Sequence, residues 1–196
     1  MSAQPSHRGG ALVSAKRSHR GGALVSAVHP SGPTPARVAD AARLRATVAA
    51  VPDPEIPVLT IDDLGILRDL RIEGDRVEVD ITPTYSGCPA MDVIRAGIEA
   101  ALRAQGCAEV SVRTILSPAW STDWMSDTGR RRLLDYGIAP PAPVAAAGMT
   151  ALPLSVACPQ CGSAHTEELS RFGSTPCKAL RRCGSCREPF DHFKPH

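Results

Sequence analysis

Residues 76–94, RVEVDITPTYSGCPAMDVI, decide the fold because they hold a strand, a loop and the start of a helix in close succession. Val77, Val79 and Ile81 alternate with polar residues, which is typical of a strand with one buried and one solvent-facing side. Pro89 suits the first turn of a helix, and apolar residues then recur at helical spacing. We therefore expect a strand that leads through a loop into an amphipathic helix.

The neighbouring sequence completes one compact domain. Residues 64–72 read as a second strand, which a short glycine-containing turn joins to the first in a β-hairpin. Strand character returns at residues 110–116, and helical patterns occupy residues 35–51 and 127–136. The order helix, strand, strand, helix, strand, helix predicts an α+β domain over residues 35–138.

Three further segments lie outside this domain. The decapeptide SHRGGALVSA at residues 6–15 is repeated without change at 18–27, so we expect residues 1–34 to be a disordered, low-complexity leader. Residues 139–155 are rich in Pro and Ala and carry no charge, as in a semi-rigid linker. Five of the seven cysteines follow, which predicts a separate C-terminal module at residues 156–196.

Charge and hydropathy exclude two kinds of partner. The net charge is +2, but the first 39 residues hold five basic and no acidic residues, so the remainder carries −3. A slightly acidic body gives no electrostatic case for a nucleic acid. No apolar run approaches the roughly 18 residues that span a bilayer. We therefore expect a cytoplasmic protein that binds neither nucleic acid nor membrane.

Two C-x-x-C pairs stand in the C-terminal module with 21 residues between them. Thiolates at this spacing can coordinate one tetrahedral metal ion. A module of about 40 residues has too small a core to fold without such a cross-link. Disulfides are disfavoured because no credible secretion signal exists, and redox pairs are disfavoured because neither lies in a βαβ unit. We predict a structural zinc ion in a zinc-ribbon-like module, held by Cys158, Cys161, Cys183 and Cys186.

Other assignments in this module stay open at the level of sequence. Cys177, His165 and His192 are also possible metal ligands by their position in the sequence. Two C-x-x-C pairs are a stronger indication of a metal site than a single cysteine. Four cysteine thiolates serve an iron–sulfur cluster as well as zinc, so spacing alone does not separate the two.

Cys88 differs from the cysteines of the module, because it lies where a strand ends and a helix begins. The unpaired N–H groups and the positive dipole end of a helix N-terminus favour a thiolate, which makes a nucleophile, a redox centre or a metal ligand. The alternative is a buried residue that only caps the helix. No histidine lies between residues 30 and 164, which disfavours a cysteine hydrolase.

Three short blocks carry a family resemblance. They are DPE at residues 53–55, DLG at 63–65 and TPTYSGCP at 82–89. Together they resemble the iron–sulfur assembly domain of SufT and of the cytosolic iron–sulfur targeting factors, over about residues 38–138. This resemblance implies a small α+β domain with a mixed sheet.

Longer blocks narrow the resemblance. DPEIPVLTIDDLGI at residues 53–66, SPAWSTDWM at 117–125 and FGSTPCKALRRC at 172–183 are similar to the accessory (D) subunits of the bacterial ring-1,2-phenylacetyl-CoA epoxidase. That family implies an accessory protein of aerobic phenylacetate degradation and no catalysis by this chain. Its expected partners are the oxygenase and reductase subunits of the epoxidase and iron–sulfur assembly proteins.

The resemblance also assigns site residues. Cys88 takes the place of the assembly family's reactive cysteine, and four residues match its polar surroundings: Asp53, Glu55, Asp63 and Thr82. Carboxylates raise a thiol's pKa unless a cation sits among them, so this set favours a metal over a free nucleophile.

We expect Cys88 to hold iron or an iron–sulfur cluster transiently and to deliver it to the oxygenase or its reductase.

The sequence departs from the family at two places. The duplicated leader lies outside the match, and Pro195 stands where a cysteine is expected. The competing interpretation is a structural subunit that docks on the oxygenase without handling metal. A nucleic-acid-binding ribbon protein is a distant third.

Overall fold

The computed structural model describes residues 35–143 and 155–196, and these belong to one compact unit. The predicted leader and most of the predicted linker lie outside the described residues. None of the helices in the described ranges has the length and apolar character needed to cross a membrane.

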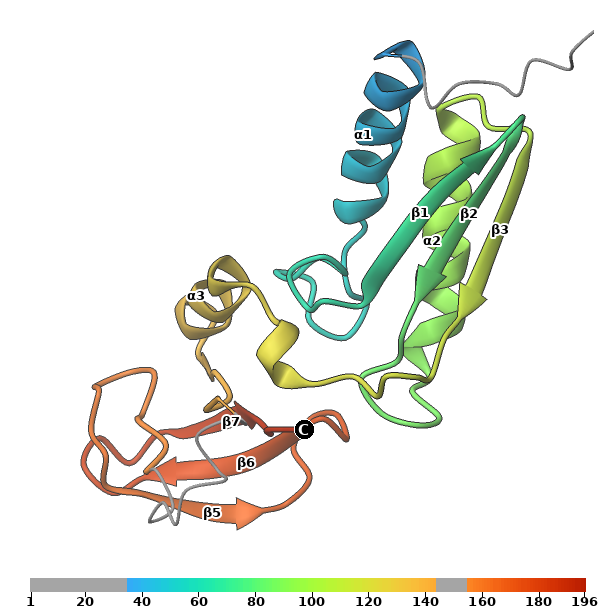
Figure 1. Cartoon of the computed structure of the whole chain (residues 1–196). Helices are drawn as coiled ribbons and strands as arrows, with labels where there is room; N and C mark the ends of the chain where they lie inside the picture. The colour runs from blue at the N-terminus through green and yellow to red at the C-terminus, as the bar shows by residue number, and fades with distance from the viewer. Residues whose placement is uncertain (1–34, 144–154) are drawn as a thin grey trace, which may run out of the picture. The chain divides into compact units, whose positions relative to one another are not determined.

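The first sheet has three strands in the order β1-β2-β3 (Figure 1). Strands β1 (Leu67–Glu73) and β2 (Arg76–Ile81) form the predicted antiparallel hairpin, and β3 (Glu109–Thr114) pairs with β2 in parallel. A parallel pair needs a crossover, which helix α2 (Ala90–Ala104) supplies. The central strand β2 is the stretch whose apolar residues alternate in the sequence.

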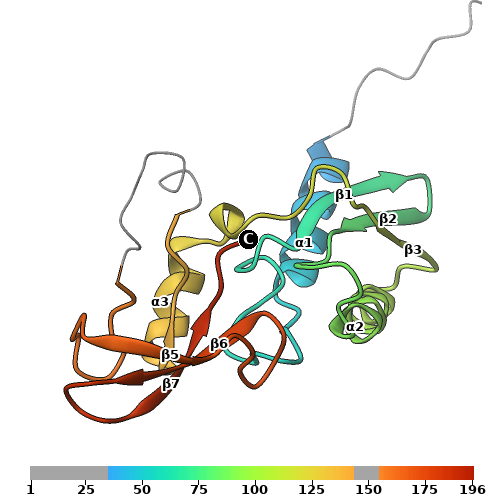
Figure 2. The same ribbon diagram turned by 90° about the horizontal axis from the view of Figure 1, so that it is seen from below.

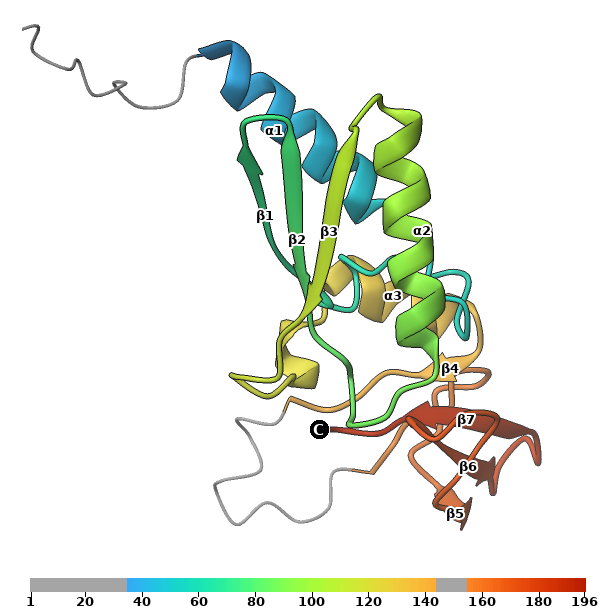
Figure 3. The same ribbon diagram turned by 90° about the vertical axis from the view of Figure 1, so that its right-hand side faces the viewer.

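Helices α1 (Pro35–Ala49) and α2 cover one face of this sheet (Figure 3). Their apolar side chains pack with those of β2, and the buried residues include Val48, Val77, Val79, Ile94 and Ile98. The opposite face is polar, and there Asp80 accepts hydrogen bonds from Arg71 and Arg113. The predicted α+β class and the mixed sheet are confirmed.

A second sheet contains four strands in the order β4-β7-β6-β5 (Figure 3). Figure 2 shows β5, β6 and β7 of this sheet from below. Strands β5 (Thr166–Ser170), β6 (Lys178–Cys183) and β7 (Pro189–Phe193) belong to the C-terminal module and pair antiparallel. Strand β4 (Ile138–Ala139) follows helix α3 (Asp127–Asp135) and pairs with β7 in parallel. Ala139, which we assigned to the linker, is therefore part of this sheet.

The segment between β3 and α3 joins the two sheets. Trp120 is buried, donates from its indole N–H to the carbonyl of Leu64 at 2.9 Å, and lies with its ring centre 6.2 Å from that of Phe193. The short 3-10 helix η1 (Thr122–Trp124) follows, and the backbone N–H of Thr122 donates to the carbonyl of His196. The C-terminal end of the chain is thus packed against the first domain.

Candidate functional site

Four cysteine sulfurs of the C-terminal module lie within 4.8 Å of one another. Two of the separations are 3.7 Å, between Cys158 and Cys186, and 3.6 Å, between Cys161 and Cys183. Tetrahedral coordination with zinc–sulfur bonds of about 2.3 Å puts the sulfurs about 3.8 Å apart. The four residues that the sequence singled out therefore fit a tetrahedral metal ion.

The backbone of the module arranges these thiols. Gly162 has a φ of +72°, which turns the chain so that its N–H donates to the carbonyl of Cys158. In the second pair, the N–H groups of Ser185 and Cys186 point at the sulfur of Cys183. Donation from the Cys186 N–H is the main cause that lowers the pKa of Cys183 to about 6. The second pair thus favours a thiolate at Cys183. At Cys186 a backbone N–H lowers the pKa, but burial and the neighbouring thiols outweigh it and raise the pKa to about 12.

The other candidate ligands of the module lie outside this group. His165 packs against Gly184, and His192 is buried, so that desolvation lowers its pKa to about 4. Cys177 is buried too, but it packs with the core of the first domain. Among the described residues, only the four predicted cysteines form a group of this kind.

Cys88 lies half-buried just before α2, where the backbone N–H of Ala90 faces its sulfur. Burial is the main cause that raises the pKa of the Cys88 thiol, and the negative charge of Glu55 raises it further. The backbone N–H of Ala90 and the nearby hydroxyls of Thr84 and Tyr85 lower the pKa of Cys88 without outweighing these effects. The helix terminus alone favours a thiolate, but the free thiol here is protonated at neutral pH.

Asp53 and Glu55 lie on a tight turn that precedes the first sheet. The backbone N–H groups of Glu55 and Ile56 donate to Oδ1 of Asp53 at 2.9 and 2.8 Å, so the Asp53 carboxylate fixes the turn. Burial raises the pKa of both carboxyls, and the charge of Asp53 adds to the rise at Glu55. Lys178, a buried residue of β6, opposes the rise at each of them.

Asp63 makes its hydrogen bonds to a different part of the molecule. Its carboxylate accepts from the N–H and hydroxyl of Thr60, from the hydroxyl of Ser126 and from the Arg132 guanidinium. Burial by itself raises the pKa of Asp63, but these donors together hold it below its usual value. The hydrogen bonds join the turn at residues 60–65 to the start of α3.

Two buried hydroxyls have no hydrogen-bond partner among the described residues: Oγ1 of Thr82 and the phenol of Tyr85, which lies near Cys88. Burial is the main cause that raises the pKa of Tyr85 to about 12, and the charges of Cys88, Glu55 and Cys177 contribute. A buried unpaired hydroxyl costs about 1–3 kcal/mol, so these groups mark a polar place where a ligand can restore the bonds.

The sequence analysis named Thr82 as a site residue. It did not predict that Tyr85, Lys178 and Cys177 lie near Glu55. Tyr85 lies in the loop TPTYSGCP at residues 82–89, and a single aromatic residue among small ones could have indicated a role in the site. Lys178 and Cys177 come from the C-terminal module, and no local pattern shows that they approach Glu55.

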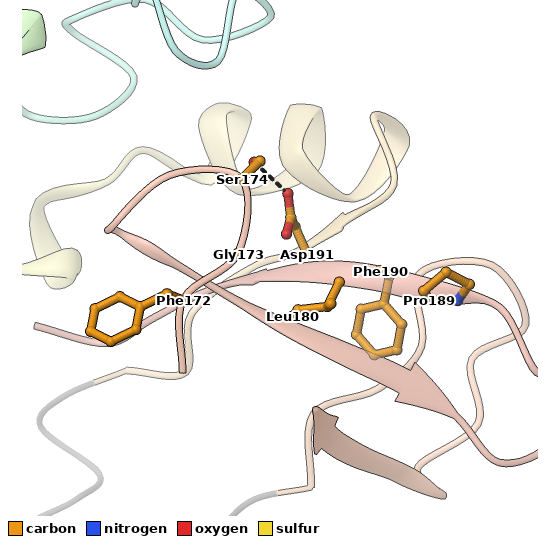
Figure 4. A pocket seen from close by; sticks show the side chains of 7 residues that line it. All are labelled: Phe172, Gly173, Ser174, Leu180, Pro189, Phe190 and Asp191. Atoms are coloured by element: carbon orange, nitrogen blue, oxygen red, sulfur yellow. Dashed lines mark hydrogen bonds between the residues drawn. The ribbon is translucent and has the colours of Figure 1, made fainter. Parts of the chain in front are cut away.

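A shallow pocket on the C-terminal sheet has a different character (Figure 4). Phe172, Leu180 and Phe190 line it, and its carboxylate, Asp191, accepts from the hydroxyl of Ser174 at 2.7 Å. The lining holds neither a thiol nor a histidine, so the pocket offers no chemistry like that around Cys88.

Comparisons with known proteins match the first domain and the C-terminal module to two different families. Residues 41–113 match the family of iron–sulfur cluster assembly proteins, and residues 143–194 match the PaaD zinc beta ribbon domain. An Escherichia coli K12 protein, named as the putative D subunit of 1,2-phenylacetyl-CoA epoxidase, is 51% identical over 149 residues, which are 76% of this chain and 89% of that protein.

Two solved structures are also similar. The domain of unknown function DUF59 from Bacillus anthracis is 27% identical, with a TM-score of 0.46, and the match covers 49% of this chain and 92% of that one. A Mycobacterium tuberculosis protein described as associated with Fe-S complex assembly and repair is 27% identical, with a TM-score of 0.28, and the match covers 56% of this chain and 93% of that one.

Proposed function

The chain belongs to the family of 1,2-phenylacetyl-CoA epoxidase accessory (D) subunits, and from this premise we propose that it delivers iron or an iron–sulfur cluster to the oxygenase or its reductase. The family and the iron–sulfur assembly domain make it an accessory protein. The observation that carries the finer proposal is the surroundings of Cys88, where the thiol lies near the Glu55 carboxylate and the unpartnered phenol of Tyr85.

The raised pKa of Cys88 suits a carrier that binds its cargo for a short time. A metal ion must displace the thiol proton before it binds sulfur, so a raised pKa lowers the affinity at neutral pH. Modest affinity lets the cargo leave for the client protein. The same raised pKa makes Cys88 a poor free nucleophile, which supports a non-catalytic role.

We assign zinc to the four-cysteine group of the C-terminal module. The match to a zinc beta ribbon domain and the sulfur separations support zinc as the resident ion. When bound, zinc supplies a structural cross-link, because the module's own core is small: its buried members among the described residues are Ala139, Cys158, Cys183 and Phe190. Metal analysis of protein purified without chelator tests this: about one zinc per chain supports it, and an iron–sulfur absorption band contradicts it.

The expected partners are the oxygenase and reductase subunits in the cytoplasm, together with the proteins that assemble iron–sulfur clusters. A second candidate function, docking on the oxygenase without metal transfer, is favoured by the exposed apolar side chains of Leu116 and Phe172. Both functions predict a complex, so they differ only in the metal content of the client.

The deciding experiment compares the epoxidase complex isolated from cells with and without this chain. Delivery predicts that the oxygenase or the reductase loses most of its iron when the chain is absent, while the polypeptides accumulate normally. If both clients keep full iron and only their association weakens, the docking function replaces the proposed one.

A further inference from the structure

Phe172 is the most exposed of the large apolar side chains that the structure describes, at 69%. A single exposed apolar residue is ordinary on a protein surface. Phe172 differs because it lines the shallow pocket on the C-terminal sheet, which has a volume of about 410 Å³ (Figure 4). Three further apolar residues line the same pocket: Leu180, Pro189 and Phe190. The exposed ring therefore belongs to a larger apolar surface.

The pairing of the strands shows why this pocket is open. Leu180 of β6 pairs with Asp191 of β7 and with Ser170 of β5, so these three side chains share one face of the sheet. Lys178 and Phe193 form the pair two residues along on the same face, and both are buried. Phe193 packs there with the core of the first domain, whereas Leu180 and Asp191 are only half-buried. Within the described residues, the first domain thus covers one part of this face and leaves the pocket open.

Basic side chains lie beside the pocket. Nζ of Lys194 lies 4.9 Å from the centre of the Phe172 ring, and it donates to the carbonyl of Arg171 at 3.1 Å. Arg182 stands opposite Pro189 in the strand register, so it lies on the pocket's face of the sheet. Arg171 and Arg182 are both exposed. Three cations therefore accompany one apolar surface.

These three cations form no ion pair within the described parts of the chain. The carboxylate that lines the pocket, Asp191, is already engaged, because it accepts from the hydroxyl of Ser174 at 2.7 Å and lies 3.7 Å from Nζ of Lys178. Glu167 stands opposite Arg182 in the register, but the two side chains do not form an ion pair. The positive charge beside the pocket is thus available to acidic residues of a partner.

We propose that the pocket is a docking site for the oxygenase, which inserts one large apolar side chain beside Phe172 and places acidic residues against the three cations. This inference rests on the proposed function, which makes the oxygenase a partner, and it names the surface where the two proteins meet. An apolar anchor supplies much of the affinity at such a site, and complementary charges at its rim steer association and fix the orientation. The C-terminal module then has a purpose beyond its own stability.

The test measures binding of the full-length protein to oxygenase purified from cells that lack this chain. Phe172 and Arg182 are exposed, so replacing either of them should leave the fold intact. We expect Phe172→Ala to weaken binding at least about tenfold, because it removes the aromatic anchor. Arg182→Glu should weaken binding severalfold and reduce its sensitivity to salt, because an attraction at the rim becomes a repulsion.

Two control variants are matched in exposure and chemistry. Tyr136→Ala removes an aromatic side chain that is 57% exposed at the end of α3, and Arg45→Glu reverses an exposed charge on α1. Both should bind the oxygenase as the wild type does. If Phe172→Ala and Arg182→Glu also bind as the wild type does, or if the wild-type chain binds no oxygenase, the inference is overturned.

Iron in the oxygenase and the reductase, measured in cells that express each variant, separates this inference from the proposed function. If client iron depends on this chain but Phe172→Ala binds as the wild type does, the inference alone fails. If Phe172→Ala loses binding while the clients keep full iron in cells without this chain, the docking site stands and the delivery of iron fails.

Photo-cross-linking identifies the occupant of the pocket directly. The photo-reactive residue p-benzoylphenylalanine in place of Phe172 keeps an aromatic ring at this position, and on irradiation it bonds covalently to the group that lies against it. A cross-link to an acidic segment of the oxygenase supports the inference. A cross-link to the reductase, to a second copy of this chain or to another part of the same chain overturns it.

Discussion

At the scale of single residues, the central feature is a thiol whose surroundings pull its pKa in opposite directions. The N–H of Ala90 stabilises the Cys88 thiolate, while burial and the Glu55 carboxylate destabilise it. Burial and Glu55 outweigh Ala90, so the pKa of Cys88 is raised. Cys88 is therefore a protonated thiol that needs a cation to become a ligand, which distinguishes it from the activated cysteines of hydrolases.

This balance predicts the effect of Glu55→Gln on the chemistry of Cys88. Removing the negative charge lowers the pKa of Cys88, so the thiolate fraction at pH 7.5 rises. Iodoacetamide should alkylate Cys88 severalfold faster, because the thiolate is the reacting species and its fraction rises. Peptide mass spectrometry measures the rate.

Cys107 provides an internal reference in the same samples, and Glu73→Gln, an exposed change at the end of β1, is the matched control. An unchanged or slower alkylation of Cys88 in Glu55→Gln would show that Glu55 does not set the charge at this thiol.

At the scale of elements, Asp63 joins the turn at residues 60–65 to helix α3. Gly65 belongs to the same junction, because its φ is +69° and a Cβ placed there would lie 2.7 Å from the Cβ of Trp124. Ser126 caps α3 by accepting from the N–H of Gly129, and its hydroxyl donates in turn to Asp63. The carboxylate thus orients the helix cap.

We predict that Asp63→Asn lowers the free energy of unfolding by about 1–3 kcal/mol, since it weakens several charge-assisted hydrogen bonds of a buried group. The folded-state pKa of Asp63 lies below the unfolded value of about 3.9, so its contribution is complete above that value and is lost as the pH falls through the folded value. The stability gap between wild type and variant should therefore be constant near pH 7 and shrink below about pH 4.

Chemical denaturation at several pH values measures this gap. Asp62→Asn is the matched control, because Asp62 is the exposed neighbour of Asp63 and should change stability by less than about 0.5 kcal/mol. A gap for Asp63→Asn that persists at pH 3 would contradict the assigned role of its charge.

The elements differ in how well the sequence predicts them. Strand β2 and helix α2 were predictable because their apolar residues repeat with periods of two and 3.6. Strand β4 was not, because two residues, Ile138 and Ala139, are too few to show a period, and only the pairing with β7 defines them. The cluster of four cysteines follows from local spacing, whereas the approach of Cys177 to Glu55 depends on tertiary packing across the chain.

At the scale of the whole molecule, the two sheets share core residues. Phe193 and Cys177 pack with the first domain, and Ala139 packs in the core of the C-terminal sheet. We predict that removing the metal with a chelator lowers the melting temperature of the entire protein in a single transition. A loss of a few kcal/mol corresponds to a fall of about 10 °C in a chain of this size.

Tryptophan fluorescence reports on the first domain through Trp120, and circular dichroism reports on both sheets. Cys158→Ser should reproduce the effect of the chelator. A fluorescence transition that keeps its original midpoint after metal removal would show that the two sheets unfold independently.

The role of Cys88 in taking hold of iron for delivery is tested most directly by one substitution. The N–H of Ala90 faces the Cys88 sulfur, and a serine hydroxyl accepts from such a group at least as well, so Cys88→Ser leaves a purely structural role intact and removes the proposed metal ligand. The variant and the control Cys107→Ser are each expressed in a host that lacks the wild-type protein, and iron is measured in the purified oxygenase and reductase. We predict a folded Cys88→Ser protein, a client with most of its iron missing, and full iron with Cys107→Ser. Full iron and full epoxidase activity with Cys88→Ser would contradict the delivery role.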